Sequence, residues 1–405
     1  MLTDARDSAT ALGDPDVQLL RDVATAVVHL SRVRQLTSFA LPYPRQAQRA
    51  LDAVVLACLR QGARPPSGVP GLLEWCRARP VSNWPLEGLA ELGGLADLAR
   101  TGEDLLIDVA AQAPSQLCHE LALEGGSRSS AQQVSGAVVR RAMRLCRDAY
   151  LPESYTAFRR LLVEQPVLTR AALTSTLADL YLDPVRELID LVYVPVPDNY
   201  VRDGAYTPCA RCRTLLTPLA DGGWWCEHAR CRFAGAPAPG TPLVRAATGE
   251  VRHLEQPLRL FVTGPGRAEI ALEERLTQLG LTVDMWPGFD AYDLRVTFPD
   301  GRVWAVDVKD WVHAGFLGRS ANPVRGEPPY DEACWAVPAF RVEQRRDYLQ
   351  VYERESADRP GRPPLLTDDH VVRAASARLR GVQGPRARIS PSPGPAGDGE
   401  GDSRA

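Results

Sequence analysis

An aspartate and a lysine, Asp307 and Lys309, stand two positions apart in a run of alternating apolar residues that predicts a strand. Period two places them on one face with Val303 and Ala305, a face that otherwise reads as apolar. Burying two charges there costs several kcal/mol unless they are paired or bind an ion. With Asp293 on the preceding strand, the set offers two carboxylates for a hard divalent cation and an ammonium to position or activate a water. Such a set is suited to hydrolysing a phosphodiester.

Lysine usage strengthens this interpretation. Lysine and arginine together number 47, and Lys309 is the single lysine among them. A compact ammonium with a readily shifted pKa differs chemically from a planar guanidinium fork. Its retention at this position therefore indicates a chemical role for Lys309.

A helix and a hairpin are expected to position these residues. Apolar side chains recur at helical spacing across residues 266–279, at Ala268, Leu272, Leu276 and Leu279, and Gly280 ends the pattern. Asp293 then opens a strand, and Pro299-Asp300-Gly301 predicts a hairpin turn into the returning strand. At 100° per residue Glu269 lies at the edge of the apolar stripe, so we expect it to supply a helix-borne acid.

This order of elements and acids resembles the PD-(D/E)xK restriction-endonuclease-like fold across residues 258–380. The resemblance implies a C-terminal α/β domain with a mixed sheet and four catalytic residues, Glu269, Asp293, Asp307 and Lys309. It also implies Mg²⁺ (or Mn²⁺) held by Asp293 and Asp307, and a lysine that assists the attacking water. In one departure, Ala291-Tyr292 precede Asp293 where the family often has proline.

Two close cysteine pairs form a second motif. Cys209 and Cys212 are separated by a thirteen-residue loop from Cys226 and Cys231. This spacing is typical of a zinc ribbon, in which two tight turns bring four thiolates to one structural Zn²⁺. His228 is an alternative fourth ligand, and a redox pair or two disulfides are weaker alternatives in a cytosolic chain. The arginines around these cysteines either grip a phosphate backbone or are solvated on a zinc-stapled linker, and the sequence leaves both open.

The first two hundred residues predict helices throughout. Helical patterns start at Pro15, after Pro44, and across residues 129–146, 153–163, 169–182 and 183–192. We therefore expect a multidomain chain, with an all-α interaction domain at 1–198, a zinc-ribbon module at 199–250, a nuclease-like domain at 251–380 and a disordered tail at 381–405.

The remaining C-terminal elements follow the same patterns. We expect strands at 258–262 and 334–337, a turn at 263–266, a loop at 315–329, a short strand end at Leu365-Leu366 and a last helix from the N-cap Thr367 to Leu379. A helix at 340–352 would carry Arg341 and Arg345 one turn apart, where both could contact the nucleic-acid phosphate.

Composition bounds the function. The net charge of -3 argues against a general nucleic-acid coat, so contact with a phosphate backbone requires a local patch. The first residues contain no apolar signal region, and no stretch is long enough to span a membrane, so we expect a cytoplasmic protein without a membrane partner.

The order of helical region, cysteine-pair module and nuclease-like domain is similar to that of restriction-endonuclease-related proteins associated with PIWI-RE (prokaryotic Argonaute-type) proteins and a DinG-type helicase. The resemblance implies DNA as the substrate and a role in defence against invading DNA. The competing hypothesis is a non-catalytic adaptor that binds nucleic acid or protein on a nuclease-like scaffold. The sequence leaves open DNA versus RNA, duplex versus single strand, the recognition sequence, and whether the protein is a homodimer.

Overall fold

The computed structural model describes residues 15–31, 43–86, 104–110, 112–124, 131–381 and 390–391. The helices are α1 (Pro15–Leu30), α2 (Arg45–Arg60), α3 (Val69–Ala78), α5 (Gln116–Glu124), α6 (Ala131–Asp148), α7 (Pro152–Glu164), α8 (Arg170–Leu177), α9 (Arg186–Val192), α10 (Ala229–Phe233), α11 (Arg245–Thr248), α12 (Gln256–Leu258), α13 (Gly264–Gln278), α14 (Pro287–Asp290), α15 (Ala314–Arg319), α16 (Ala339–Gln344), α17 (Tyr348–Glu355) and α18 (Asp368–Leu379). Shorter turns of 3₁₀ helix are η1 (Val81–Asn83), η3 (Leu180–Val185) and η4 (Asp198–Tyr200), and η5 (Arg259–Thr263) is a π-helix.

The strands are β1 (Ile107–Asp108), β2 (Ala113–Pro114), β3 (Val167–Thr169), β4 (Tyr193–Pro195), β5 (Val201–Arg202), β6 (Ala205–Tyr206), β7 (Thr217–Pro218), β8 (Trp224–Trp225), β9 (Leu243–Val244), β10 (Val251–Leu254), β11 (Thr282–Met285), β12 (Leu294–Thr297), β13 (Val303–Val308), β14 (Glu332–Val337), β15 (Leu365–Thr367) and β16 (Ser390–Pro391). Among the described residues, no helix is both long and apolar enough to cross a membrane.

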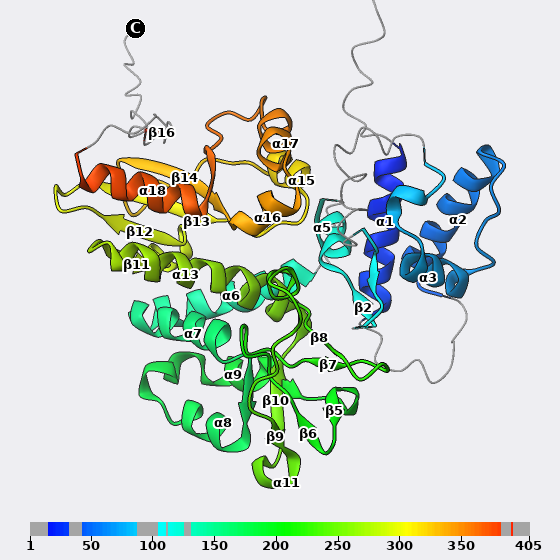
Figure 1. The fold of residues 1–405 in the computed structure, drawn as a ribbon, viewed down its shortest axis with the longest axis horizontal. Helices are drawn as coiled ribbons and strands as arrows, with labels where there is room; N and C mark the ends of the chain where they lie inside the picture. The colour runs from blue at the N-terminus through cyan, green and yellow to red at the C-terminus, as the bar shows by residue number, and fades with distance from the viewer. Residues whose placement is uncertain are drawn as a thin grey trace, which may run out of the picture.

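A mixed sheet forms the centre of the C-terminal half, as predicted. Its strands run in the order β11-β12-β13-β14-β15, with β16 paired to β14. The first three strands are antiparallel neighbours, whereas β13, β14 and β15 are parallel. Helices α13 and α18 contact each other and pack on the same face of this sheet, and Figure 1 shows α15, α16 and α17 grouped at one end. The predicted helix, hairpin and final helix are confirmed, and β11 is an additional strand between the helix and the hairpin.

The two faces of β13 enter different cores, as period two requires. Trp304, Val306 and Val308 pack in a large core with α13, α7 and α18. Val303 and Ala305 pack in a second core under α15 and α17. The sheet is thus covered on both sides, and the strand that ends in Asp307 is held firmly by its neighbours.

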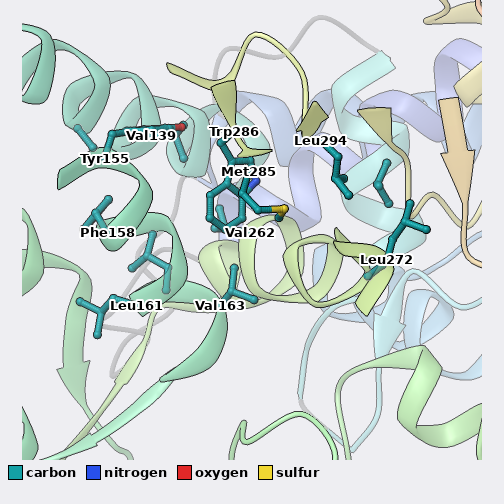
Figure 2. Packing of buried hydrophobic residues seen from close by; sticks show 14 of the residues in the cluster. Val139, Tyr155, Phe158, Leu161, Val163, Val262, Leu272, Met285, Trp286 and Leu294 are labelled. Atoms are coloured by element: carbon teal, nitrogen blue, oxygen red, sulfur yellow. The ribbon is translucent and has the colours of Figure 1, made fainter. Parts of the chain in front are cut away.

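The N-terminal region is mainly helical but not entirely so. Helices α1, α2, α3 and α5 share one core, while β1 pairs with β2 in a small hairpin. More unexpectedly, β3 and β4 pair on either side of β10, which lies beyond the cysteine motif in the chain. The helices from α6 to α9 also share the large core of the C-terminal sheet. Figure 2 shows Val139 of α6 and Phe158 of α7 among the residues of this core. The predicted limits at 198 and 251 therefore separate residues that the structure packs together.

Several local predictions were wrong. Residues 258–262 form no strand: together with 263–266 they are the end of α12, the π-helix η5 and the first turn of α13. Leu258 and Val262 are buried, and a helix buried on several sides shows the same continuous apolar run as a strand. The expected helix at 340–352 is two helices broken at Arg345, whose backbone is extended, and the loop at 315–329 begins with most of α15. Most of the predicted tail lies outside the described residues.

Helix α13 approaches α7 closely at Gly266. A Cβ atom added there would lie 2.3 Å from Val163 Cγ2. We expect Gly266→Ala to destabilise the protein by roughly 1–3 kcal/mol, because a well-packed core must shift to admit the methyl group. Urea unfolding measures the effect, and Gly326→Ala is the matched control, since a Cβ there meets nothing within 4 Å. Equal stability of the two variants would contradict this close packing.

Candidate functional site

The end of β13 brings the predicted acid and lysine together. Lys309 Nζ lies 2.6 Å from Asp307 Oδ2, and both side chains are about one-fifth exposed (24% and 19%). The backbone N–H of Lys309 donates to Ala336 O on β14, which fixes the position of the residue just past the strand. Lys309 is thus held just past the end of β13, and its side chain is partly exposed to solvent.

Asp293 reaches the same point from the start of β12. Its Oδ2 accepts a hydrogen bond from the Val308 backbone N–H at 2.6 Å, and its own backbone O accepts from Trp286 N at 2.8 Å. The antiparallel pairing of Leu294 with Val306 places the two strand acids beside each other. The structure therefore brings together three of the four predicted catalytic residues, Asp293, Asp307 and Lys309.

Glu269 lies nearby but is held by other partners. It is buried on α13, and its Oε2 accepts a hydrogen bond from Trp286 Nε1 and lies 3.4 Å from Arg159 Nη2. Arg159 comes from α7 and also lies 3.7 Å from Asp290 Oδ1. A buried arginine from the N-terminal half thus forms an ion pair with the helix-borne acid.

The segment just before Asp293 has an unusual backbone. Trp286, Phe289 and Asp290 adopt positive φ angles of 49°, 58° and 67°, a region that costs non-glycine residues of the order of 1 kcal/mol or more each. The burial of Trp286 and its bond to Glu269 hold this conformation in place. Such strain concentrates at functional sites, and here it sets the start of β12.

The crowding of carboxylates has an electrostatic consequence. Burial, the charges of Glu269 and Asp307, and a hydrogen bond with Asp307 raise the pKa of Asp293 well above its usual range. Burial likewise raises the pKa of Glu269, which the charge of Arg159 only partly offsets. Burial by itself favours a neutral Lys309, but the charges of Asp307 and Asp293 outweigh it and raise the lysine pKa. A buried carboxylate whose ionisation is disfavoured by a neighbouring carboxylate, as in Asp293, is suited to a cation placed between the two.

The carboxylates do not form a closed three-acid cage. Within the described ranges, the four cysteines are the one set of three or more His, Cys, Asp or Glu residues whose ligand atoms all lie within 4.8 Å of one another. Asp293 and Asp307 therefore offer an open site to a hard cation, which usually keeps several waters. Glu269 acts on that site through its charge.

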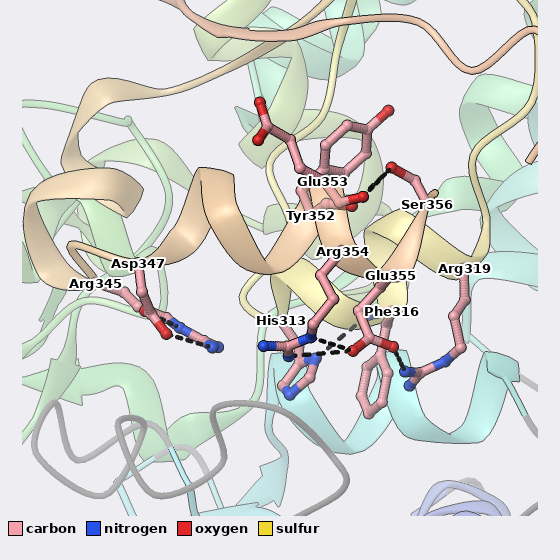
Figure 3. Close-up of polar contacts among 10 residues, drawn as sticks. All are labelled: His313, Phe316, Arg319, Arg345, Asp347, Tyr352, Glu353, Arg354, Glu355 and Ser356. Carbon is pink, nitrogen blue, oxygen red and sulfur yellow. Dashed lines mark hydrogen bonds and ion pairs between the residues drawn. The ribbon is translucent and has the colours of Figure 1, made fainter. Parts of the chain in front are cut away.

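Arg341 and Arg345 lie outside this cluster of acids. Both are buried: Arg341 Nε donates to Asp310 Oδ1 at 2.7 Å, and Arg345 Nε donates to Asp347 Oδ1 at 2.8 Å. Figure 3 shows the Arg345 guanidinium turned toward Asp347. The break between α16 and α17 removes the common helical face that sequence periodicity suggested for the two arginines.

Helix α5 binds the chain just beyond Lys309. Glu120 accepts hydrogen bonds from the backbone N–H groups of Val312 and His313, at 2.8 and 3.0 Å. Gln116 donates to Asp310 O at 2.9 Å and accepts from Arg341. The N-terminal helical region thus anchors the segment that follows β13.

This anchor predicts a pH dependence. Burial raises the pKa of Glu120 from 4.5 to about 7, against the lowering effect of its hydrogen bonds. The folded state therefore binds more protons than the unfolded state between these values, so the Glu120 contribution to the free energy of unfolding falls as pH rises from about 4.5 to about 7. The loss is of the order of 3 kcal/mol at 1.4 kcal/mol for each pKa unit.

Glu120→Gln is expected to remove this pH dependence while losing a backbone hydrogen bond worth about 1 kcal/mol. The variant should be less stable than the parent at pH 5 and should lose less stability than the parent by pH 8. Urea unfolding at the two pH values measures the comparison. Parallel losses in both proteins would contradict a titrating Glu120.

The second predicted site also assembles. The Sγ atoms of Cys209 and Cys231 lie 4.0 Å apart, and those of Cys212 and Cys226 lie 3.5 Å apart. A tetrahedron with Zn–S bonds of about 2.3 Å has edges near 3.8 Å, so four thiolates at these separations fit Zn²⁺. The distances are too long for disulfides, and all nine cysteines are free. His228 is not one of the four, because Cys231 completes the set.

Most arginines of the cysteine module are used within the fold. Arg202 and Arg211 donate to backbone carbonyls, and Arg259 forms a buried ion pair with Glu227. Arg232 donates to the carbonyls of residues 226 and 227. These contacts favour the structural interpretation of the module over a broad phosphate grip.

Comparison with known families supports the resemblance stated above. Residues 266–383 match the model described as REase associating with pPIWI_RE. Residues 19–169 match the model described as pPIWI_RE three-gene island domain Y. The chain is therefore a restriction-endonuclease-like protein of PIWI-RE systems. No curated protein and no solved structure matches it.

Sequence reasoning missed the residues that come from the N-terminal half. Arg159 lies on the apolar stripe of α7 with Tyr155, Phe158 and Leu162, and all four are buried. An arginine on such an apolar stripe requires a buried acidic partner, so its position in the sequence could have indicated a buried ion pair. Glu120 gave a similar signal on α5, where its neighbours Leu117 and Leu121 are buried.

Proposed function

We propose that this protein is a metal-dependent nuclease that hydrolyses phosphodiester bonds in DNA. The observation that carries the proposal is the convergence of Asp293, Asp307 and the chain's single lysine at the end of β13. The matched description of the C-terminal domain as a REase supports the same reaction class. The restriction-endonuclease-like fold is part of this proposal and rests on the mixed sheet flanked by α13 and α17.

Asp293 and Asp307 would hold Mg²⁺ or Mn²⁺, because carboxylate oxygens suit these hard cations and a cation would offset the burial and repulsion that raise the pKa of Asp293. A divalent ion bound there supplies Lewis-acid polarisation of the phosphate. The hydrogen bond from the Val308 N–H to Asp293 Oδ2 fixes the position of this carboxylate.

Lys309 would orient the attacking water and stabilise the charge that develops on the phosphate. Its raised pKa keeps the side chain an ammonium, so it acts as a hydrogen-bond donor rather than as a base. The ion pair with Asp307 holds the ammonium in place before the substrate arrives. Glu269 would support the site from α13, positioned by Trp286 and Arg159.

Arg341 and Arg345 are proposed contacts for the DNA backbone. Because each now binds a carboxylate, either arginine would have to exchange Asp310 or Asp347 for a phosphate. We further propose that the nuclease acts in the cytoplasm in defence against foreign DNA, alongside a PIWI-RE protein and a DinG-type helicase. The names of the two matched domains, which refer to pPIWI_RE and a three-gene island, support this setting.

Incubation of the purified protein with supercoiled plasmid and with single-stranded DNA, in Mg²⁺ or Mn²⁺, tests the activity. Metal-dependent conversion of plasmid to nicked or linear product is the expected result, and the product shows whether one strand or two is cut. Absence of cleavage of both substrates, with and without the PIWI-RE protein, would favour the adaptor hypothesis.

A further inference from the structure

A cavity of about 700 Å³ lies where three parts of the chain meet. Domain Y contributes the β1–β2 hairpin and α5, the zinc module contributes Trp225 and Phe233, and the nuclease-like domain contributes Val312 and Gln344. This volume is within the range of small-molecule sites. None of its side chains has a role in the proposed chemistry, so the cavity needs its own explanation.

The wall of the cavity carries aromatic rings with accessible surface. Phe233 is 43% exposed, an unusual exposure for a phenylalanine, and its ring centroid lies 5.8 Å from that of Phe340 on α16. Trp225 is half-buried, with the Arg232 guanidinium 5.3 Å from its ring centroid. Rings of this kind are platforms on which an unstacked nucleobase lies flat.

Side-chain amides supply the polar part of the wall. Gln116, Gln256 and Gln344 all face the cavity. Within the described part of the chain, the amides of Gln256 and Gln344 have no hydrogen-bond partner. A glutamine amide presents one donor and one acceptor side by side, which matches the edge of a base. The acids in the wall, Asp108 and Glu227, disfavour a phosphate inside the same space.

A smaller cavity of about 260 Å³ shares part of this wall, including Gln116 and Leu260. Its lining is more cationic than that of the larger cavity, with four arginines (211, 230, 267 and 341) against two acids (227 and 310). It also includes buried His228, whose Nε2 atom has no hydrogen-bond partner in the described structure. The two neighbouring cavities therefore suit the two parts of a nucleotide. The smaller one, with its arginines and His228, suits the phosphate, and the larger one, with its aromatic rings and amides, suits the base.

The larger cavity lies close enough to the end of β13 for one DNA chain to reach both. Val312 in the cavity wall is three residues after Lys309, so the two lie within about 11 Å of each other even along a fully extended chain. We propose that this cavity binds an unstacked base of a single-stranded DNA segment next to the cleavage centre. The proposal rests on the proposed nuclease function for the identity of its ligand.

Fluorescence anisotropy with a labelled single-stranded DNA oligonucleotide, in buffer without divalent ions, tests the cavity. We expect Phe233→Ala to raise the Kd by about ten-fold or more, and Gln344→Ala to raise it less. Tyr181→Ala is the matched control, because Tyr181 is 65% exposed and is not part of either cavity wall. Zinc content and melting temperature verify that the exposed Phe233 was removed without loss of the fold.

Duplex DNA of the same sequence should compete poorly, because its stacked bases cannot enter the cavity. The proposal is overturned if the parent protein does not bind the oligonucleotide, if Phe233→Ala and Gln344→Ala bind like Tyr181→Ala, or if the duplex competes as well as the single strand. Plasmid cleavage is measured separately. If the protein cleaves plasmid but the cavity variants bind DNA normally, the cavity proposal alone is overturned. If the cavity variants lose DNA binding but the parent shows no metal-dependent cleavage, the nuclease proposal alone is overturned.

Discussion

Asp307→Asn is expected to lower the rate of plasmid cleavage by about 10³-fold, equivalent to roughly 4 kcal/mol of transition-state stabilisation. The change removes one of two carboxylates available to the cation and also the charge that holds Lys309 Nζ at 2.6 Å. The amide has nearly the same shape as the carboxylate, so the strand and its neighbours should pack as before. The initial rate of supercoiled plasmid loss in Mg²⁺ measures the effect.

The same substitution is expected to change the stability of the metal-free protein little, because loss of the Lys309 ion pair and relief of repulsion with Asp293 oppose each other. The charge of Asp307 raises the pKa of Asp293, so its removal relieves repulsion between buried carboxylates. Asp300→Asn is the matched control, because Asp300 lies at the turn of the same hairpin and pairs with Arg378. Near-parental cleavage by Asp307→Asn, or an equal loss in Asp300→Asn, would contradict the assignment.

Lys309→Arg separates charge from geometry at the same site. Arginine keeps the positive charge but spreads it over a planar fork, which cannot occupy the position of a compact ammonium. If Lys309 orients a water, the arginine variant should lose most of the activity that Lys309→Ala loses. Full activity of the arginine variant would show that charge alone is sufficient.

Short-range rules explain why the strand acids could be located from the sequence. Period two and a hairpin turn fix which residues of β12 and β13 are neighbours, so Asp293 and Asp307 had to meet. The N-cap Thr367, whose side chain accepts from His370 N, followed from equally local chemistry. The cysteine pairs needed only two tight turns and a loop.

Long-range packing explains what the sequence did not show. Arg159 and Glu269 are 110 positions apart, and no local pattern pairs an arginine of one helix with an acid of another. The strands β3, β4 and β10 have only three or four residues each, which is too short for an alternating apolar and polar pattern to be recognised in the sequence. The left-handed residues from Trp286 to Asp290 are set by burial and by Glu269, which outweigh the ordinary preferences of these residue types.

Removal of zinc is expected to unfold the cysteine module, an effect on structure and not only on catalysis. Cys226→Ser should reduce bound zinc from about one ion per chain to nearly none, because three thiolates cannot close the tetrahedron. Structural zinc contributes apparent free energies of about 10–16 kcal/mol in small zinc peptides, far more than the two-residue strands β7 and β8 can replace. The module should therefore lose its fold around the cysteines.

That loss should spread in a defined direction. Arg211 binds Cys231 O, Arg267 on α13 binds Arg211 O, and Arg259 pairs with Glu227, so the module is tied to the start of the helix that carries Glu269. Hydrogen exchange should increase across residues 206–233 and at the beginning of α13, while β12, β13 and β14 stay protected because their cores lie on the sheet.

Cys146→Ala is the matched control for this experiment, since it removes a buried thiol that lies outside the cysteine cluster. Its zinc content should equal that of the parent. Unchanged hydrogen exchange in Cys226→Ser would show that the cysteines pack without a metal. Uniform loss of protection through β13 would instead show that the zinc module and the catalytic strand form one cooperative unit. Only the expected pattern is consistent with a zinc module that supports the proposed cleavage centre through α13 and leaves the sheet itself intact.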